Sequence, residues 1–158
     1  MTLRSKVLTG FFVVFACAGA VVSFQPSLVF SHCQIPCGIY GDSARFEAMA
    51  EHITTIEKSM KLITELSKEQ SPNYNQLVRW VQNKENHATE LTDIVTYYFM
   101  AQRVKPADKS DAKAHGDYVA KLQLLHHLLF YAMKAKQTTD QATITKLRSA
   151  LASFKTVY

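Results

Sequence analysis

Hydrophobic residues recur at steps of three and four along most of the chain beyond position 41, which is the spacing of one face of an α-helix. Four segments carry this pattern. The first begins near Asp42 or Ser43, either of which is a candidate N-cap, and the second follows Pro72 and ends before Pro106. The third covers about residues 113–136, and the fourth reaches residue 158. This part of the chain is therefore predicted to be all-α.

Each segment gathers its apolar residues into one stripe, and the second stripe is interrupted at Lys84. The stripe residues, segment by segment, are Phe46, Met49, Ile53, Ile56, Met60 and Ile63; Leu77, Val81, Ala88, Leu91, Val95 and Tyr98; Tyr118, Leu122, Leu125, Leu129 and Ala132; and Ile144, Leu147, Leu151, Phe154 and Tyr158. Four amphipathic helices with short connections predict an antiparallel four-helix bundle over residues 42–158. Met49, Met60, Met100 and Met133 are expected to fill its core.

The first 31 residues have the pattern of a secretory signal. Arg4 and Lys6 precede an apolar run over residues 7–22, and a more polar segment leads to Ser31. The residues before position 32 favour cleavage between Ser31 and His32, although cuts after residues 18, 20 or 23, or a retained membrane anchor, are alternatives. We therefore expect a processing peptidase as a partner, membrane contact only through the uncut leader, and a periplasmic or extracellular product.

Charge gives no indication of a nucleic-acid partner. Removing residues 1–31 removes two basic residues and no acidic one, so the net charge falls from +5 to about +3. The remaining charges are mixed along the helices, without a basic run or alternating basic and aromatic residues. The mature chain is thus predicted to be a mildly cationic single domain that does not bind nucleic acid.

The mature chain would keep two cysteines, Cys33 and Cys37, because Cys17 lies in the leader. In an exported protein such a pair is compatible with a disulfide, here closing a small loop around Pro36. The spacing is neither the C-x-x-C of thioredoxin-like proteins nor the C-x-x-C-H of c-type haem attachment. One interpretation of the chain is therefore an exported helical interaction module with a Cys33–Cys37 disulfide.

A second interpretation follows if cleavage makes His32 the N-terminus. Its free amino group, the amide nitrogen of Cys33 and the Cys33 thiolate are consecutive donors, and the Cys37 thiolate can complete a plane of four. Two nitrogens and two thiolates in a plane favour nickel(II), with copper as the competitor. The His32 ring remains available as an axial ligand. Such a site suits one-electron redox chemistry, or a metal carrier without turnover.

The motif H-C-x-x-P-C-G-x-Y over residues 32–40, followed by helices, resembles the nickel hook of the nickel superoxide dismutases. The resemblance implies disproportionation of superoxide to dioxygen and hydrogen peroxide by nickel cycling between the +2 and +3 states. It also implies a homohexamer of four-helix bundles and a hook that forms only after the pro-segment is removed. The expected organisation is a leader over residues 1–31, a hook over residues 32–41 and a bundle over residues 42–158.

Carried over by position, the resemblance gives five residues a role. His32 would bind nickel through its terminal amine and its imidazole, Cys33 through amide nitrogen and sulfur, and Cys37 through sulfur. Tyr40 would stand beside the open face and order water or substrate, so it joins these ligands as a catalytic residue. Glu47 would hold the axial histidine ring from a second shell, as metal-bound histidines usually require.

The chain departs from the family pattern at two places. Gln34 stands where an acidic residue often follows the first hook cysteine, so a proton-supply role for that acid is in doubt. His87 is the nearest equivalent of an arginine that pairs with the glutamate in some members. Tyr98, in preference to Tyr97, is the candidate for a further family tyrosine near the metal.

The other histidines of the predicted bundle are expected at its surface or satisfied within it. They are His52, His115, His126 and His127. Adjacent helical residues point about 100° apart, so His126 and His127 are not expected to chelate one ion together.

Overall fold

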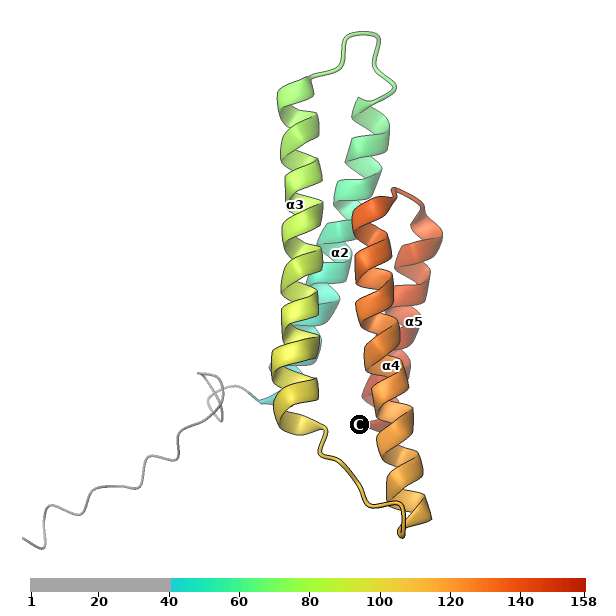
Figure 1. Ribbon diagram of the computed structural model, residues 1–158. Helices are drawn as coiled ribbons and strands as arrows, with labels where there is room; N and C mark the ends of the chain where they lie inside the picture. The colour runs from blue at the N-terminus through green and yellow to red at the C-terminus, as the bar shows by residue number, and fades with distance from the viewer. Residues whose placement is uncertain (1–40) are drawn as a thin grey trace, which may run out of the picture. The chain divides into compact units, whose positions relative to one another are not determined.

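Four long helices run up and down through the part of the chain that the computed structural model describes, residues 41–158 (Figure 1). They are α2 (Asp42–Leu66), α3 (Tyr74–Asp93), which continues directly as the π-helical segment η1 (Ile94–Arg103), α4 (Ala112–Gln137) and α5 (Gln141–Val157). The predicted all-α four-helix bundle is confirmed. The predicted leader and the hook up to residue 40 lie outside the described residues. Within residues 41–158, no helix has both the length and the hydrophobicity that a membrane crossing requires.

The helices form a ring in which each contacts its two neighbours. α2 packs against α3 and α5, and α4 packs against α3 and α5. The hairpin of α2 and α3 extends past the turn between α4 and α5, as Figure 1 shows. Towards that tip the predicted stripes lose their opposing helices, so Ile63 and Leu77 are only half-buried and Val81 is exposed. The predicted stripe is therefore wrong at Val81. It is also wrong at Tyr158, which is exposed although its ring contacts Phe46, Phe99 and Phe154.

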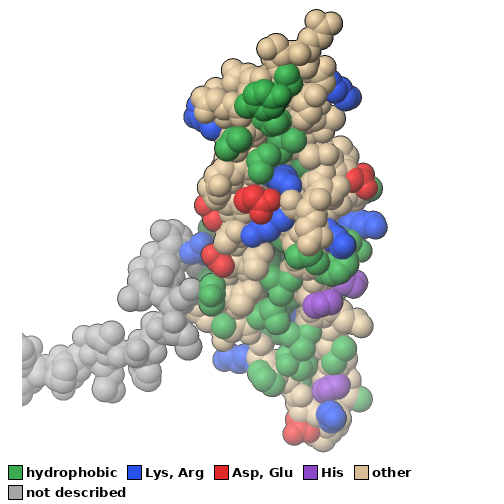
Figure 2. Space-filling view, turned by 45° about the horizontal axis from the view of Figure 1, so that its top comes forward, with side chains coloured by type: hydrophobic (Ala, Val, Ile, Leu, Met, Phe, Trp, Pro, Cys, Tyr) green, Lys and Arg blue, Asp and Glu red, His purple; other side chains and the backbone are tan. Residues whose placement is uncertain are grey.

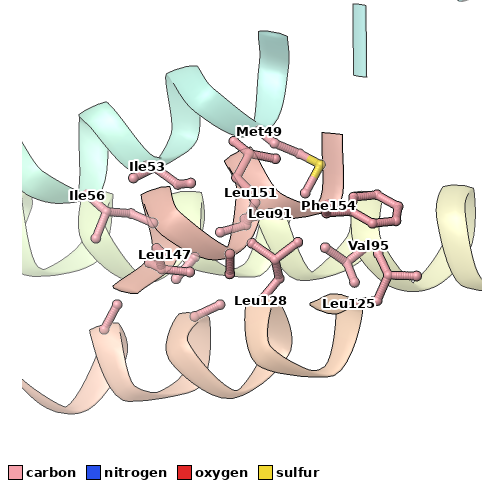
Figure 3. Packing of buried hydrophobic residues seen from close by; sticks show 14 of the residues in the cluster. Met49, Ile53, Ile56, Leu91, Val95, Leu125, Leu128, Leu147, Leu151 and Phe154 are labelled. Atoms are coloured by element: carbon pink, nitrogen blue, oxygen red, sulfur yellow. The ribbon is translucent and has the colours of Figure 1, made fainter. Parts of the chain in front are cut away.

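Side chains from all four helices meet in one hydrophobic core (Figure 3). Its labelled members are Met49, Ile53, Ile56, Leu91, Val95, Leu125, Leu128, Leu147, Leu151 and Phe154. On α4 the buried stripe includes Leu128 and Ala135, two positions that the predicted stripe did not contain. Met49 and Met60 are fully buried as predicted, whereas Met100 and Met133 are exposed, so the expectation that they fill the core is wrong. These two sit on the outward sides of η1 and α4.

Lys84, the residue that interrupts the second stripe, is buried at the end of α4. Its ammonium group donates hydrogen bonds to the backbone carbonyls of Lys136 and Thr138, and it lies 3.6 Å from the carboxylate of Glu85. The last carbonyls of a helix have no partner within it and carry partial negative charge. A cation from α3 therefore satisfies the C-terminal end of α4, and this explains a charged residue inside an apolar stripe.

The helix starts differ in how their backbone N–H groups are satisfied. α3, α4 and α5 begin after Asn73, Asp111 and Asp140, whose side chains accept hydrogen bonds from backbone N–H groups of the first turn. α2 instead has Gly41 as its N-cap, without a side-chain cap. The predicted cap at Asp42 or Ser43 is therefore wrong, because the Asp42 carboxylate is used elsewhere.

The Asp42 carboxylate accepts three hydrogen bonds from groups far away in the sequence. The Tyr98 hydroxyl donates to it at 2.6 Å, the Arg103 Nε at 2.8 Å and the Tyr158 hydroxyl at 3.1 Å. The donors belong to η1 and to the end of the chain after α5. We call this arrangement the Asp42 clamp. It ties the first residue of α2 to both segments.

The π-helical geometry of η1 makes the clamp possible. In an α-helix, residues five apart point about 140° away from each other. In a π-helix, whose hydrogen bonds run from i to i+5, such residues point much more nearly in the same direction. Tyr98 and Arg103 are five apart and reach the same carboxylate, and the Arg103 guanidinium also lies 5.3 Å from the centre of the Tyr98 ring. The sequence pattern predicted one continuous helix here and did not indicate this change of pitch.

Charge and burial set the protonation states within the clamp. Burial alone would raise the pKa of the Asp42 carboxyl, but the hydrogen bonds from Arg103, Tyr98 and Tyr158 outweigh it and hold the pKa below its usual value. Burial, followed by the hydrogen bond to Asp42, raises the pKa of Tyr158 to about 12. The carboxylate is thus charged and the hydroxyl is a neutral donor at neutral pH.

The clamp predicts a pH-dependent contribution to stability. Asp42→Asn removes the charge and should lower the free energy of unfolding by about 1–2 kcal/mol at pH 7. Because the folded pKa of Asp42 is depressed, this contribution is complete above about pH 4, the ordinary value, and is lost as the pH falls below it. Urea unfolding of both proteins between pH 3 and pH 7 measures the difference.

The matched control is Asp117→Asn on α4. Asp117 forms an ion pair with Lys113, and both side chains are largely exposed, so its replacement should change little. Equal effects of the two substitutions, or an Asp42→Asn effect that persists unchanged at pH 3, would contradict the clamp.

Candidate metal centre

The described structure begins where the predicted hook ends. His32, Cys33, Cys37 and Tyr40 lie outside the described residues, so their predicted roles stay predictions. Gly41, the residue after Tyr40, is extended, with φ −71° and ψ 157°, and α2 starts at the next residue. The chain that carries the predicted hook therefore joins the bundle at the Asp42 clamp, and the clamp fixes its point of attachment.

Glu47, the predicted support of the axial histidine ring, is exposed on α2 and faces α5. It lines a groove between these helices together with Arg148 and Lys155 of α5. The floor of the groove is apolar and includes Phe46 and Leu151. Glu47 thus lies about one and a half turns into α2 from the point where the hook joins, in the same groove as Lys155 and as Arg148, which is ion-paired with Glu57.

Tyr98 is the better placed of the two predicted tyrosines. Its ring is buried and its hydroxyl donates to Asp42, whereas Tyr97 is half exposed. Burial, followed by the hydrogen bond to Asp42, raises the pKa of the Tyr98 hydroxyl. Tyr98 therefore contacts the residue at the root of the hook, and its predicted place near the metal stays a prediction.

Cationic side chains surround this end of the bundle. The guanidinium groups of Arg45 and Arg103 each lie 5.3 Å from the centre of the Tyr98 ring, and Lys121 lies 5.7 Å from that of Tyr158. Elsewhere on the face shown in Figure 2, basic and acidic side chains are intermingled. These cations lie around the hook attachment, where Arg103 is also ion-paired with the Asp42 carboxylate.

His87 lies away from Glu47, against His52 of α2. The two Nδ1 atoms are 2.9 Å apart, and Glu90, one turn after His87 on α3, approaches both rings. His52 and Glu47 are five residues apart on α2, so they point about 140° apart. Glu47 therefore lies on the side of α2 that faces α5, whereas His87, its predicted partner, contacts the side of α2 that faces α3.

The pairing of His52 with His87 was missed by sequence reasoning, which expected His52 at the surface of the bundle or satisfied within it. A signal was present, because His87 and Glu90 are spaced i, i+3 on one face of α3. The sequence does not show which residues of α2 lie opposite which residues of α3, so the contact of His52 with His87 could not be predicted. The expectation for His126 and His127 agrees with the structure, since both are exposed on α4 and their ring centres are 6.4 Å apart.

Comparison with known proteins supplies the identity of the family. A family model described as nickel-containing superoxide dismutase matches residues 27–158, a range that includes the hook motif and all four helices. Neither the curated proteins nor the solved structures that were searched gave a match. Because the family model covers most of the sequence, the chain belongs to the nickel-containing superoxide dismutase family.

Proposed function

We propose that the reaction of this family takes place at an N-terminal hook formed by His32, Cys33 and Cys37 after cleavage of the Ser31–His32 bond. The reaction converts two superoxide anions and two protons into one dioxygen and one hydrogen peroxide. The observation that carries the proposal is the family match, because it spans the hook motif and the bundle together. The helical part supplies a fixed point of attachment at the Asp42 clamp.

The donor set of the hook fits nickel. His32 would offer its terminal amine, Cys33 its amide nitrogen and thiolate, and Cys37 a second thiolate. Two nitrogen and two thiolate donors in a plane are the arrangement that nickel(II) prefers. Bound there, nickel supplies a one-electron couple between its +2 and +3 states, which the strongly donating thiolates and amidate make accessible.

Other residues of the chain would position and attract the substrate. Tyr40 would hold water or superoxide at the open face through its hydroxyl. Glu47 would orient the His32 ring, and the cations around it would favour approach of the superoxide anion. Superoxide is so small that the reaction needs little substrate binding. The protein would therefore contribute by holding the metal ligands in place and by attracting the superoxide anion electrostatically.

Export and assembly belong to the same proposal. The pattern of residues 1–31 supports removal by a signal peptidase and a periplasmic or extracellular mature protein. Tyr74, Val78 and Val81 form an exposed apolar row at i, i+4 and i+7 on α3, which supports association with another protein surface. The homohexamer itself is what the resemblance of the hook motif to the family implies.

The hook predicts that neither cysteine can be replaced. Cys33→Ser and Cys37→Ser each remove a thiolate donor, so protein beginning at His32 should lose both its nickel and its activity. Metal analysis and the rate of superoxide decay measure the two properties on the same sample. Nickel-loaded wild-type protein that is no faster than free nickel would contradict the enzyme, and a Cys33–Cys37 disulfide in the active protein would contradict the ligand set.

If the cations attract superoxide electrostatically, the rate of the reaction should depend on the salt concentration. The rate constant for superoxide decay should fall as ionic strength rises from about 10 to 150 mM, because the Debye length shortens from about 30 to 8 Å. Lys155→Gln, beside Glu47, should lower the low-salt rate by roughly twofold. Lys68→Gln, beyond the opposite end of α2, is the control and should have no effect. Identical behaviour of the two variants would exclude steering by Lys155.

A further inference from the structure

His52, His87 and Glu90 converge at the contact between α2 and α3, ten residues along α2 from Asp42. Ten residues of α-helix span about 15 Å, so this cluster is well separated from the Asp42 clamp. His52 comes from α2, and the other two residues come from adjacent turns of α3. No cysteine and no chain terminus takes part. The cluster is therefore a candidate for chemistry unrelated to the hook.

Three potential ligand atoms of the cluster form a nearly regular triangle. The His52 Nδ1 lies 2.9 Å from the His87 Nδ1 and 3.3 Å from Oε2 of Glu90, and the His87 Nδ1 lies 3.7 Å from the same oxygen. Among the described residues, these are the three that could hold a metal ion together. Each residue offers one ligand atom, and the three atoms lie within 4.8 Å of one another.

The size of the triangle matches tetrahedral coordination. Around an ion with bonds of about 2.0–2.1 Å, two ligand atoms of a tetrahedron are about 3.3 Å apart, which is the mean of the three observed distances. A circle through the three atoms has a radius of about 1.9 Å, so an ion at bonding distance from all three would sit slightly above their plane. The three ligand atoms are thus already at the separations that such an ion requires, and binding would displace the proton shared by the two Nδ1 atoms.

Hydrogen bonding among the three groups leaves lone pairs unused. One Nδ1 proton can join the two rings, but the acceptors outnumber the donors when both imidazoles are neutral. Burial lowers the pKa of His52, which favours the neutral ring that metal binding requires. Glu90 supplies a negative charge within reach of both rings. A divalent cation would satisfy all three acceptors at once.

Exposure of the cluster provides access for the ion. The side chains of His52 and His87 are 15% and 26% exposed, whereas that of Glu90 is 55% exposed. Two ligands are therefore held by packing between the helices, and the third closes the site from the solvent side. Water can complete the fourth position, as it does where three protein ligands bind zinc.

We propose that His52, His87 and Glu90 form a second metal site, which takes a divalent ion of the zinc class and ties α2 to α3. An ion that binds the folded protein and not the unfolded chain stabilises it by mass action. The ion would thus link α2 to α3 within the bundle, at a level where the neighbouring residues Ile53, Ala88 and Leu91 are fully buried.

The test uses zinc chloride and the full mature chain with Cys33→Ser and Cys37→Ser, so that the hook thiolates cannot take the metal. Calorimetric titration should show one zinc per chain, and a hundredfold excess over Kd should raise Tm by roughly 5–10 °C. His87→Gln should weaken zinc binding by more than about a hundredfold, since even groups that only orient ligands are worth 10–100-fold. Glu90→Gln, on the exposed ligand, should weaken it without disturbing the fold.

The matched control replaces both exposed histidines of α4, His126→Gln and His127→Gln, and should bind zinc like the parent. Cobalt(II) gives a second reading, because a site of nitrogen and oxygen ligands should show tetrahedral visible bands without thiolate charge transfer. Zinc affinity that is unchanged in His87→Gln and Glu90→Gln, or lost equally in the α4 control, would overturn the proposal. Absence of zinc binding to the parent would do so as well.

Discussion

The carboxylate of Asp42 is the point on which the rest of this structure depends. It stands at the first residue of α2, directly after the chain leaves the predicted hook, and it accepts hydrogen bonds from η1 and from Tyr158 at the end of the chain. A metal-binding terminus needs a fixed point of attachment, because ordering a flexible segment opposes binding. The bundle provides that point by joining three distant segments at one charged group.

The helical bundle could be predicted from the sequence because its apolar stripes follow the helical period. The pattern found the four helices and most of the buried positions, and it failed where tertiary arrangement decides. Val81 is exposed because the α2–α3 hairpin extends past its partners, and Asp42 does not cap α2 because distant donors hold its carboxylate. The π-helical geometry of η1 could not be predicted, because the apolar residues there recur at steps of three and four, as they do in an α-helix.

The candidate site also has a part that the sequence could predict and a part that it could not. The hook was predicted from the residue types and their spacing in residues 32–40, and the family match covers that range. The surroundings of the hook depend on helix register, which the sequence does not display. The expected pairing of Glu47 with His87 is not formed, since Glu47 faces α5 and His87 meets His52 and Glu90. The same register creates the second candidate metal site.

The central claim is that a free amino group at His32 turns this helical protein into an enzyme. The most direct measurement compares the chain that begins at His32 with the chain that begins at Ser31, each prepared metal-free and then given nickel. The account predicts one nickel per chain and rapid superoxide decay for the first protein, and loss of both for the second, because its His32 nitrogen is an amide. Equal nickel content and equal activity of the two proteins would contradict it.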